Sequence, residues 1–327
     1  MTTYVEAIRQ AYVDAMTDDE NVVVIGQGLW SPWYVGASMS DLDTMFGQER
    51  VFDTPVSEQA TTGAGVGAAL NGLRPIVVHP RVDFAMLAVD QMVTQAAKWS
   101  SMFGGRANVP VVFRLIVNRG GEQGAQHSQS MFSWFSHVPG LRVVSPSTPS
   151  DAYSLLRSAI DCNDPVVYID DRWLYGAEDT ELVLSDVLRA NLASVGPQTI
   201  RAGSDITLVA HGYSSHLASE AAKELALSGI EAEVVDLRVL NPINWDPVVE
   251  SVRRTGRLIA IDGDWLSCGI ASEVVAATTE RVAPGDLKTS PRRIAFPSAP
   301  APTSRPLEEA FYPTIRQLVD AAKQACG

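Results

Sequence analysis

Asn21-Val-Val-Val-Ile-Gly26 places four β-branched residues in a row and ends in glycine. A short, continuous apolar run of this kind predicts a strand that is buried on both faces, as strands of parallel sheets are. Comparable runs follow at residues 51–54, 74–78, 109–114, 141–145 and 165–169. The chain therefore carries a series of predicted buried strands in its first half.

Helical patterns separate these runs. Val5, Ile8, Tyr12 and Met16 recur at helical spacing and predict an amphipathic helix before the first strand. Further helices are expected at residues 61–73, at residues 84–103 and from about residue 150. Because strands alternate with helices, the pattern predicts an α/β fold with a parallel sheet.

The same alternation returns after roughly residue 190. Strands are expected at residues 205–210, 232–236 and 257–261, with helices at 215–227, at 247–255 and from about 307. The acidic stretch 175–198 is the expected connection. We therefore predict two parallel-sheet α/β domains, residues 1–190 and 191–327.

The composition limits the kinds of binding partner and the cellular compartment that we expect. The net charge of −13, from 25 basic and 38 acidic residues, argues against nucleic acid or an anionic membrane as the main partner. No apolar run approaches the ~20 residues that cross a bilayer, and no basic stretch precedes an apolar leader. Cys162, Cys268 and Cys326 lack metal-ligand spacing and are too few for a disulfide framework. A cytoplasmic location is expected.

Two loops carry the residues with catalytic potential. Thr54-Pro-Val-Ser-Glu58 supplies a carboxylate, and Gln126-His-Ser-Gln129 supplies an imidazole. Neither loop contains a nucleophile or a metal cluster, so the pair indicates proton transfer around a bound cofactor, which would carry the chemistry itself. The structural alternatives are a buried, hydrogen-bonded glutamate and a core histidine.

Two other segments resemble phosphate-binding or metal-binding loops. The run after Glu58 is rich in glycine and alanine but lacks the Gly-Lys-Ser/Thr ending of a P-loop, so close packing of a helix explains it better. Asp262-Gly-Asp264 follows a predicted strand, but no asparagine follows at a distance that would complete a divalent metal site. We expect no magnesium site in this chain.

Taken together, the motifs resemble the β subunit of the E1 component of the pyruvate-type 2-oxo-acid dehydrogenases. The matching segments are residues 53–58, 63–69, 72–75, 84–91, 125–129, 137–144, 164–167, 229–238 and 255–258. The resemblance runs from about residue 4 to the end. It implies a thiamine-diphosphate-dependent enzyme of transketolase-like fold, in which residues 1–190 bind the pyrimidine and residues 191–327 form the transketolase C-terminal-like domain.

The resemblance also implies roles for individual residues. Glu58 would hydrogen-bond N1′ of the aminopyrimidine, Phe84 would pack on that ring, and His127 would lie near the reacting carbon. A separate α-type chain would bind the diphosphate and Mg²⁺, in an α2β2 heterotetramer. The family's potassium site uses backbone carbonyls, which correspond here to Val111, Ala159, Ile160, Cys162 and Asp164.

Several positions depart from the family. Gln27 replaces an acid, the segment Leu29-Trp-Ser-Pro-Trp-Tyr34 is unusually aromatic, and Lys288 reverses a charge at a contact for the lipoyl-bearing E2 core, which disfavours that partner. His79, Arg81 and Arg119 stand near the expected pocket. They suit a polar or phosphorylated substrate, although pairing with acids across a subunit interface is an alternative.

These departures favour a two-component enzyme that takes an acyl or ketol unit, from a donor such as a 2-oxo acid, and transfers it to a carbonyl acceptor such as a sugar, with formation of a C–C bond. One alternative is a conventional E1 β subunit that passes the acyl group to lipoyl-E2. The other is a non-catalytic assembly subunit, which the presence of Glu58, Phe84 and His127 argues against.

Overall fold

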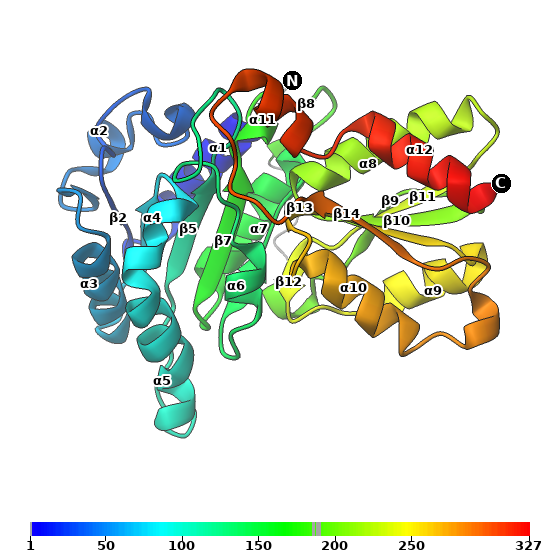
Figure 1. Ribbon diagram of the computed structural model, residues 1–327. Helices are drawn as coiled ribbons and strands as arrows, with labels where there is room; N and C mark the ends of the chain where they lie inside the picture. The colour runs from blue at the N-terminus through cyan, green and yellow to red at the C-terminus, as the bar shows by residue number, and fades with distance from the viewer. Residues whose placement is uncertain (1, 185–186, 188–190) are drawn as a thin grey trace. The chain divides into compact units, whose positions relative to one another are not determined.

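The computed structural model describes residues 2–184, 187 and 191–327 (Figure 1). The chain forms two compact units. The first contains Met1–Asn118 and Trp134–Val195, and the second contains Arg119–Ser133 and Gly196–Gly327. The predicted domain boundary after residue 190 falls at residues 188–190, outside the described part of the chain. The segment Arg119–Ser133 thus belongs to the second unit although it lies within the sequence of the first.

The predicted strands of the first unit form one parallel arrangement. Neighbours follow the order β6-β7-β5-β4-β2-β3, and each pair in it is parallel. Their bounds are β2 (Val22–Gly26), β3 (Val51–Asp53), β4 (Arg74–His79), β5 (Val112–Val117), β6 (Arg142–Val144) and β7 (Val166–Asp171). Strand β5 starts later than predicted, after Pro110, which has no N–H to donate to a ladder. The parallel α/β fold class is confirmed.

Helix α3 (Glu58–Leu70) packs closely against this sheet, as its glycine and alanine content predicts. A Cβ atom at Gly65 would lie 2.4 Å from Cγ2 of Val77 on β4, so a larger residue there would push the helix away. Helix α1 (Tyr4–Asp18) begins with a capping box between Thr3 and Glu6. Helix α7 (Pro149–Asp161) begins after the N-cap Thr148.

The helix predicted at residues 84–103 is a composite of α4 (Val82–Ala85), the 3₁₀ turn η2 (Met86–Ala88), the π-helix η3 (Asp90–Ala96) and α5 (Ala97–Met102). The shorter elements of this part of the chain are β1 (Thr2–Thr3), η1 (Tyr34–Ala37), α2 (Leu42–Phe46), α6 (Phe132–Ser136), η4 (Arg172–Leu174), β8 (Glu178–Asp179) and η6 (Leu192–Ser194). Strands β1 and β8 pair antiparallel.

The second unit contains a sheet of order β14-β13-β10-β11-β9. The three central strands were predicted: β10 (Ile206–Ala210), β11 (Ala232–Asp236) and β13 (Leu258–Trp265). Two edge strands were not predicted: β9 (Gln198–Arg201), which is antiparallel to β11, and β14 (Arg292–Phe296), which is parallel to β13. Both carry exposed polar residues and lack a continuous apolar run, because edge strands are not buried on both faces.

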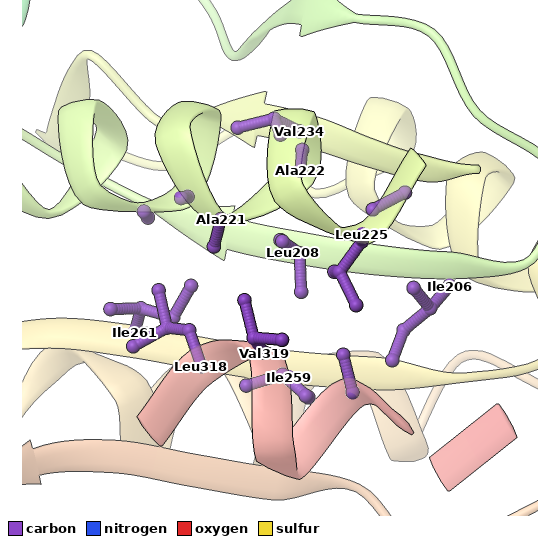
Figure 2. Packing of buried hydrophobic residues seen from close by; sticks show 14 of the residues in the cluster. Ile206, Leu208, Ala221, Ala222, Leu225, Val234, Ile259, Ile261, Leu318 and Val319 are labelled. Carbon is purple, nitrogen blue, oxygen red and sulfur yellow. The ribbon is translucent and has the colours of Figure 1, made fainter. Parts of the chain in front are cut away.

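Figure 2 shows the core on one face of this sheet. Leu208 and Ile259 on the strands meet Leu225 of α8 (Tyr213–Ala226) and Leu318 and Val319 of α12 (Ile315–Cys326). Helices α9 (Asp246–Thr255) and α10 (Ile270–Thr279) cover the opposite face (Figure 1). The remaining elements are β12 (Val239–Asn241), η7 (Pro284–Asp286) and α11 (Arg305–Phe311). None of the described helices has the length and apolar character that a bilayer-crossing helix requires.

Candidate active site

The strand order of the first sheet reverses at β2. Strand β3 lies on one side of β2, and the next strand along the chain, β4, lies on the other. At such a switch point the connections after the two central strands diverge, and they leave a crevice at the carboxyl ends. Gln27 follows β2 at this edge, β4 ends at His79, and Pro80 comes directly after it.

A cavity of about 180 Å³ occupies this place, with a lining of Gln27, Tyr34, Glu58, His79, Pro80, Arg81 and Phe84. Ligand pockets for whole small molecules typically measure ~300–1,000 Å³, so this one suits a single ring rather than a complete cofactor. The predicted site residues Glu58, Phe84, His79 and Arg81 are thus brought together in one unit. Tyr34 and Pro80 were not predicted as site residues.

Glu58 is the first residue of α3 and is only 8% exposed. Its carboxylate lies at the positive end of the helix dipole, which favours a negative charge. No residue in the described part of the chain donates a hydrogen bond to this carboxylate. A carboxylate that lines a cavity and receives no hydrogen bond from its surroundings is suited to accept one from a ligand there.

His79 is neutral at neutral pH. Burial lowers its pKa from 6.5 to about 4, and its ring is almost fully enclosed. Its Nε2 atom lies 3.0 Å from the hydroxyl oxygen of Thr62, which is also buried on α3. His79 therefore contributes hydrogen-bonding capacity to the cavity and no positive charge for a phosphate.

Arg81 provides the cationic group of the cavity. Burial lowers the pKa of its guanidinium, and nearby Asp83 opposes that shift. Arginine side chains are effectively always charged in proteins. When the side-chain oxygen of Asn118 faces it, that oxygen accepts a hydrogen bond from Arg81 Nη1 at 3.1 Å. On the other side, the Gln27 amide donates to the hydroxyl of Tyr34 at 3.1 Å.

Arg119 and His127 belong to the second unit. Arg119 is 4% exposed, and its Nη1 atom donates to the carbonyl oxygen of Gly263 at 3.2 Å. Its guanidinium also lies over the rings of Tyr213, Phe296 and Tyr312, at 5.8, 5.4 and 6.0 Å from their centroids. His127 is half-buried in the loop that follows Arg119. The predicted contact between Arg119 and a substrate stays a prediction.

The carboxylates of Asp262 and Asp264 serve contacts inside the second unit. Asp262 accepts from the backbone N–H of Ala271 and lies 3.0 Å from Nε2 of His211, and Asp264 accepts from Ser133. Among the described residues, no cluster of three His, Cys, Asp or Glu side chains has the arrangement of a metal site.

The carbonyl groups proposed for potassium have internal partners as well. Arg74 Nη1 donates to the carbonyl oxygens of Ile160, at 2.9 Å, and Cys162, at 3.2 Å. The Val111 carbonyl accepts from the backbone of Val166 at 2.9 Å. A potassium ion at these carbonyls stays a prediction, and it would share two of them with the Arg74 guanidinium.

Lys288 caps a helix. Its Nζ atom donates to the carbonyl oxygen of Thr255 at 2.9 Å, at the end of α9, and its aliphatic stem packs on Gly256. The charge at this position was interpreted as an obstacle to E2 docking. The ammonium group has a partner inside its own chain, so its charge is little evidence against binding of an E2 core.

Comparison with known proteins gives a consistent assignment. Residues 1–177 match the transketolase pyrimidine-binding domain, and residues 197–318 match the transketolase C-terminal domain. The acetoin:2,6-dichlorophenolindophenol oxidoreductase subunit beta of Cupriavidus necator is 39% identical over 97% of this chain and 95% of its own length. The pyruvate dehydrogenase E1 component subunit beta of Rhizobium meliloti is 37% identical over 98% of this chain and 69% of its own length.

Solved structures agree on the fold. A split-gene transketolase, described as an inactive β4 tetramer, superposes with a TM-score of 0.79 at 22% identity and covers 99% of this chain and 98% of its own. A transketolase from Campylobacter jejuni gives a TM-score of 0.74 at 14% identity, over 99% of this chain and 46% of its own. The chain belongs to the thiamine-diphosphate-dependent transketolase-like family and, within it, to the group of E1 β-type subunits.

Proposed function

We propose that this chain is the β-type subunit of a thiamine-diphosphate-dependent dehydrogenase E1 component that acts on a 2-oxo acid or on acetoin. The names of its relatives support this function over the sugar-accepting carboligase that the sequence favoured. The carboligase interpretation depended on Gln27, Arg81, Arg119 and Lys288. Arg119 and Lys288 have partners inside the second unit, so the argument for an unusual acceptor is reduced to Gln27 and Arg81.

The observation that carries the proposal is the Glu58 carboxylate, which is buried, lines a ring-sized cavity and has no hydrogen-bond donor among the described residues. It would accept a hydrogen bond from a ring nitrogen of the aminopyrimidine, with Phe84 packed against that ring. Thiamine diphosphate, when bound, supplies the nucleophilic carbon that attacks the substrate carbonyl. In the low dielectric of the cavity, Glu58 would hold the ring and favour the protonation state that generates this carbon.

The size of the cavity supports a second chain. About 180 Å³ suits the pyrimidine ring but leaves no room for the diphosphate. We infer that an α-type partner binds the diphosphate and Mg²⁺, and that two copies of each chain assemble as an α2β2 heterotetramer. The acyl group would then pass to the lipoyl group of an E2 core.

The test is a co-expression of this chain with a candidate α-type chain from the same organism. The purified complex is assayed for reduction of 2,6-dichlorophenolindophenol, the acceptor in the name of one relative, with pyruvate, longer 2-oxo acids or acetoin. We expect dye reduction that requires both chains and thiamine diphosphate, and binding of an E2 core that is added to the purified complex. Absence of dye reduction with every donor would contradict the proposal.

One observation keeps the carboligase as a second candidate, namely the Arg81 guanidinium at the edge of the cavity. A guanidinium in this place suits a carboxylate or phosphate on an acceptor. The same complex is therefore incubated with pyruvate and an aldose phosphate, and the products are examined by mass spectrometry. A coupled C–C product in place of dye reduction would favour the carboligase.

A further inference from the structure

The loop Arg119–Ser133, whose last two residues begin helix α6, is attached to the second unit at both of its ends. Its first residue donates from Nη1 to the carbonyl oxygen of Gly263, at 3.2 Å. Its last residue, Ser133, donates from its backbone N–H, at 3.3 Å, and from its hydroxyl, at 3.1 Å, to Oδ2 of Asp264. Both anchors lie on adjacent residues at the end of β13, where the register between β13 and β14 shifts.

The first anchor leaves little space for variation. The Arg119 guanidinium lies among three aromatic rings, and a Cβ atom at Gly263 would lie 3.1 and 3.2 Å from its two terminal nitrogens. An alanine at position 263 would therefore press the guanidinium away by a few tenths of an ångström, against the aromatic rings that surround it.

The second anchor is a buried polar cluster. Asp264 is 1% exposed, and burial raises the pKa of its carboxyl group, with further repulsion from Asp262. Next to it, the Phe132 ring packs edge-on against His211, with ring centroids 4.6 Å apart. Nε2 of His211 in turn lies 3.0 Å from Asp262. Each of the last two residues of the loop thus meets a different part of one cluster.

The middle of the loop has contacts of its own with the second unit. The backbone N–H of Glu122 donates to the buried carboxylate of Glu308 at 2.9 Å, and a Cβ atom at Gly124 would lie 2.6 Å from the hydroxyl oxygen of Thr303. Glu122 and Met131 adopt positive φ values of 62° and 60°, which non-glycine residues rarely do. Such backbone persists only where the surroundings over-determine it.

We propose that the end of β13, formed by Asp262, Gly263 and Asp264, holds the loop that carries His127, and that Arg119 and Asp264 are positioning residues for this histidine. The inference rests on the proposed function, because His127 is the loop residue expected to meet the substrate. It assigns Arg119 a task different from direct contact with an acceptor. A catalytic group must be held within a fraction of an ångström, so a loose loop costs turnover while substrate affinity is retained.

The test combines hydrogen exchange on the full chain with kinetics on the complex with its α-type partner. Gly263→Ala presses on the Arg119 guanidinium and should weaken its hydrogen bond to the carbonyl of residue 263, and Ser133→Ala removes one hydrogen bond at the other end. We expect exchange of the amides in residues 120–131 to rise about tenfold in both variants, and kcat to fall about tenfold with KM within about twofold. Ser133→Thr, which retains the hydroxyl, should restore both values.

Gly285→Ala is the matched control, because a Cβ atom there meets nothing within 4 Å. Unchanged exchange of the loop in Ser133→Ala would overturn the inference, and that variant is mild enough to fold because Ser133 is only partly buried. Equal losses in Ser133→Ala and Ser133→Thr would also overturn it. Full activity of His127→Ala would instead refute the catalytic role of the histidine, and the exchange measurement separates the two failures.

Discussion

The Nε2 atom of His79 lies 3.0 Å from the hydroxyl oxygen of Thr62, and Thr62 stands one helical turn after Glu58 on α3. This bond joins the carboxyl end of β4 to the helix that presents the Glu58 carboxylate. Both residues are buried, so the bond is shielded from water and stronger than it would be on the surface. An uncharged histidine thus links the end of β4 to the helix on which Glu58 lies.

The first prediction concerns pH and follows from His79, whose pKa burial lowers from 6.5 to about 4. Between pH 6.5 and pH 4 the unfolded chain binds a proton at this residue that the folded chain does not. The free energy of unfolding therefore falls as the pH drops below 6.5, and the full contribution of neutral His79 is present above that pH. At pH 5 the loss amounts to about 2 kcal/mol. Urea unfolding at pH 7.5 and pH 5 measures it.

His79→Asn should lack this part of the pH dependence, because asparagine does not titrate. The control is His216→Asn, which removes an exposed histidine and should leave the pH dependence as it is. If the two variants lose stability equally between pH 7.5 and pH 5, His79 is protonated in the folded state and the prediction is wrong.

The second prediction concerns Glu58→Gln. The change retains the size of the side chain but removes the negative charge, so a hydrogen bond to the cofactor ring would lose its charge-assisted character. We expect turnover to fall by at least about a hundredfold, which corresponds to roughly 3 kcal/mol of barrier. The assembled complex should retain its size in gel filtration. Glu20→Gln, at an exposed position of the same unit, should retain full activity, and comparable activity of the two variants would sink the proposed role.

The third prediction addresses Arg81. Arg81→Ala removes the guanidinium of the cavity while Glu58 and Phe84 remain in place. If Arg81 contacts a carboxylate or phosphate of a substrate, KM for that substrate should rise about tenfold or more, and kcat should change less. Arg106→Ala, which changes an exposed arginine, is the control. An unchanged KM for donor and acceptor alike would count against direct contact.

The sequence predicted the central strands because they are apolar along their whole length, as Val22–Gly26 is. It missed β14 (Arg292–Phe296), whose first two residues are exposed arginines, and α10 (Ile270–Thr279), which consists mostly of small and apolar residues and shows no clear polar stripe. Both elements become recognisable only from their contacts with β13.

The candidate site also contains residues that the sequence identified and contacts that it did not. Glu58, His79, Arg81 and Phe84 come from two short segments that lie close together in the fold, so motif and topology identify them jointly. The surroundings of Arg119 were not predictable, since its partner Gly263 lies 144 positions along the chain. The aromatic segment Leu29–Tyr34 was identified only as a departure from the family, and the contact between Tyr34 and Gln27 that the structure adds has no signature in the sequence.

The last prediction concerns Lys288, whose ammonium group donates to the final carbonyl of α9. Helix C-termini carry carbonyl groups without intrahelical partners and attract positive charge, so this contact stabilises the second unit. Lys288→Met retains most of the stem over Gly256 but removes the donor, and it should lower the free energy of unfolding by roughly 0.5–1.5 kcal/mol. Urea unfolding measures the loss, with Lys323→Met at an exposed position as the control. Binding of an E2 core should not change, because the charge that Lys288 carries already serves its own chain. A Lys288→Met variant of unchanged stability that gains E2 binding would reverse this assignment and return the residue to the docking surface.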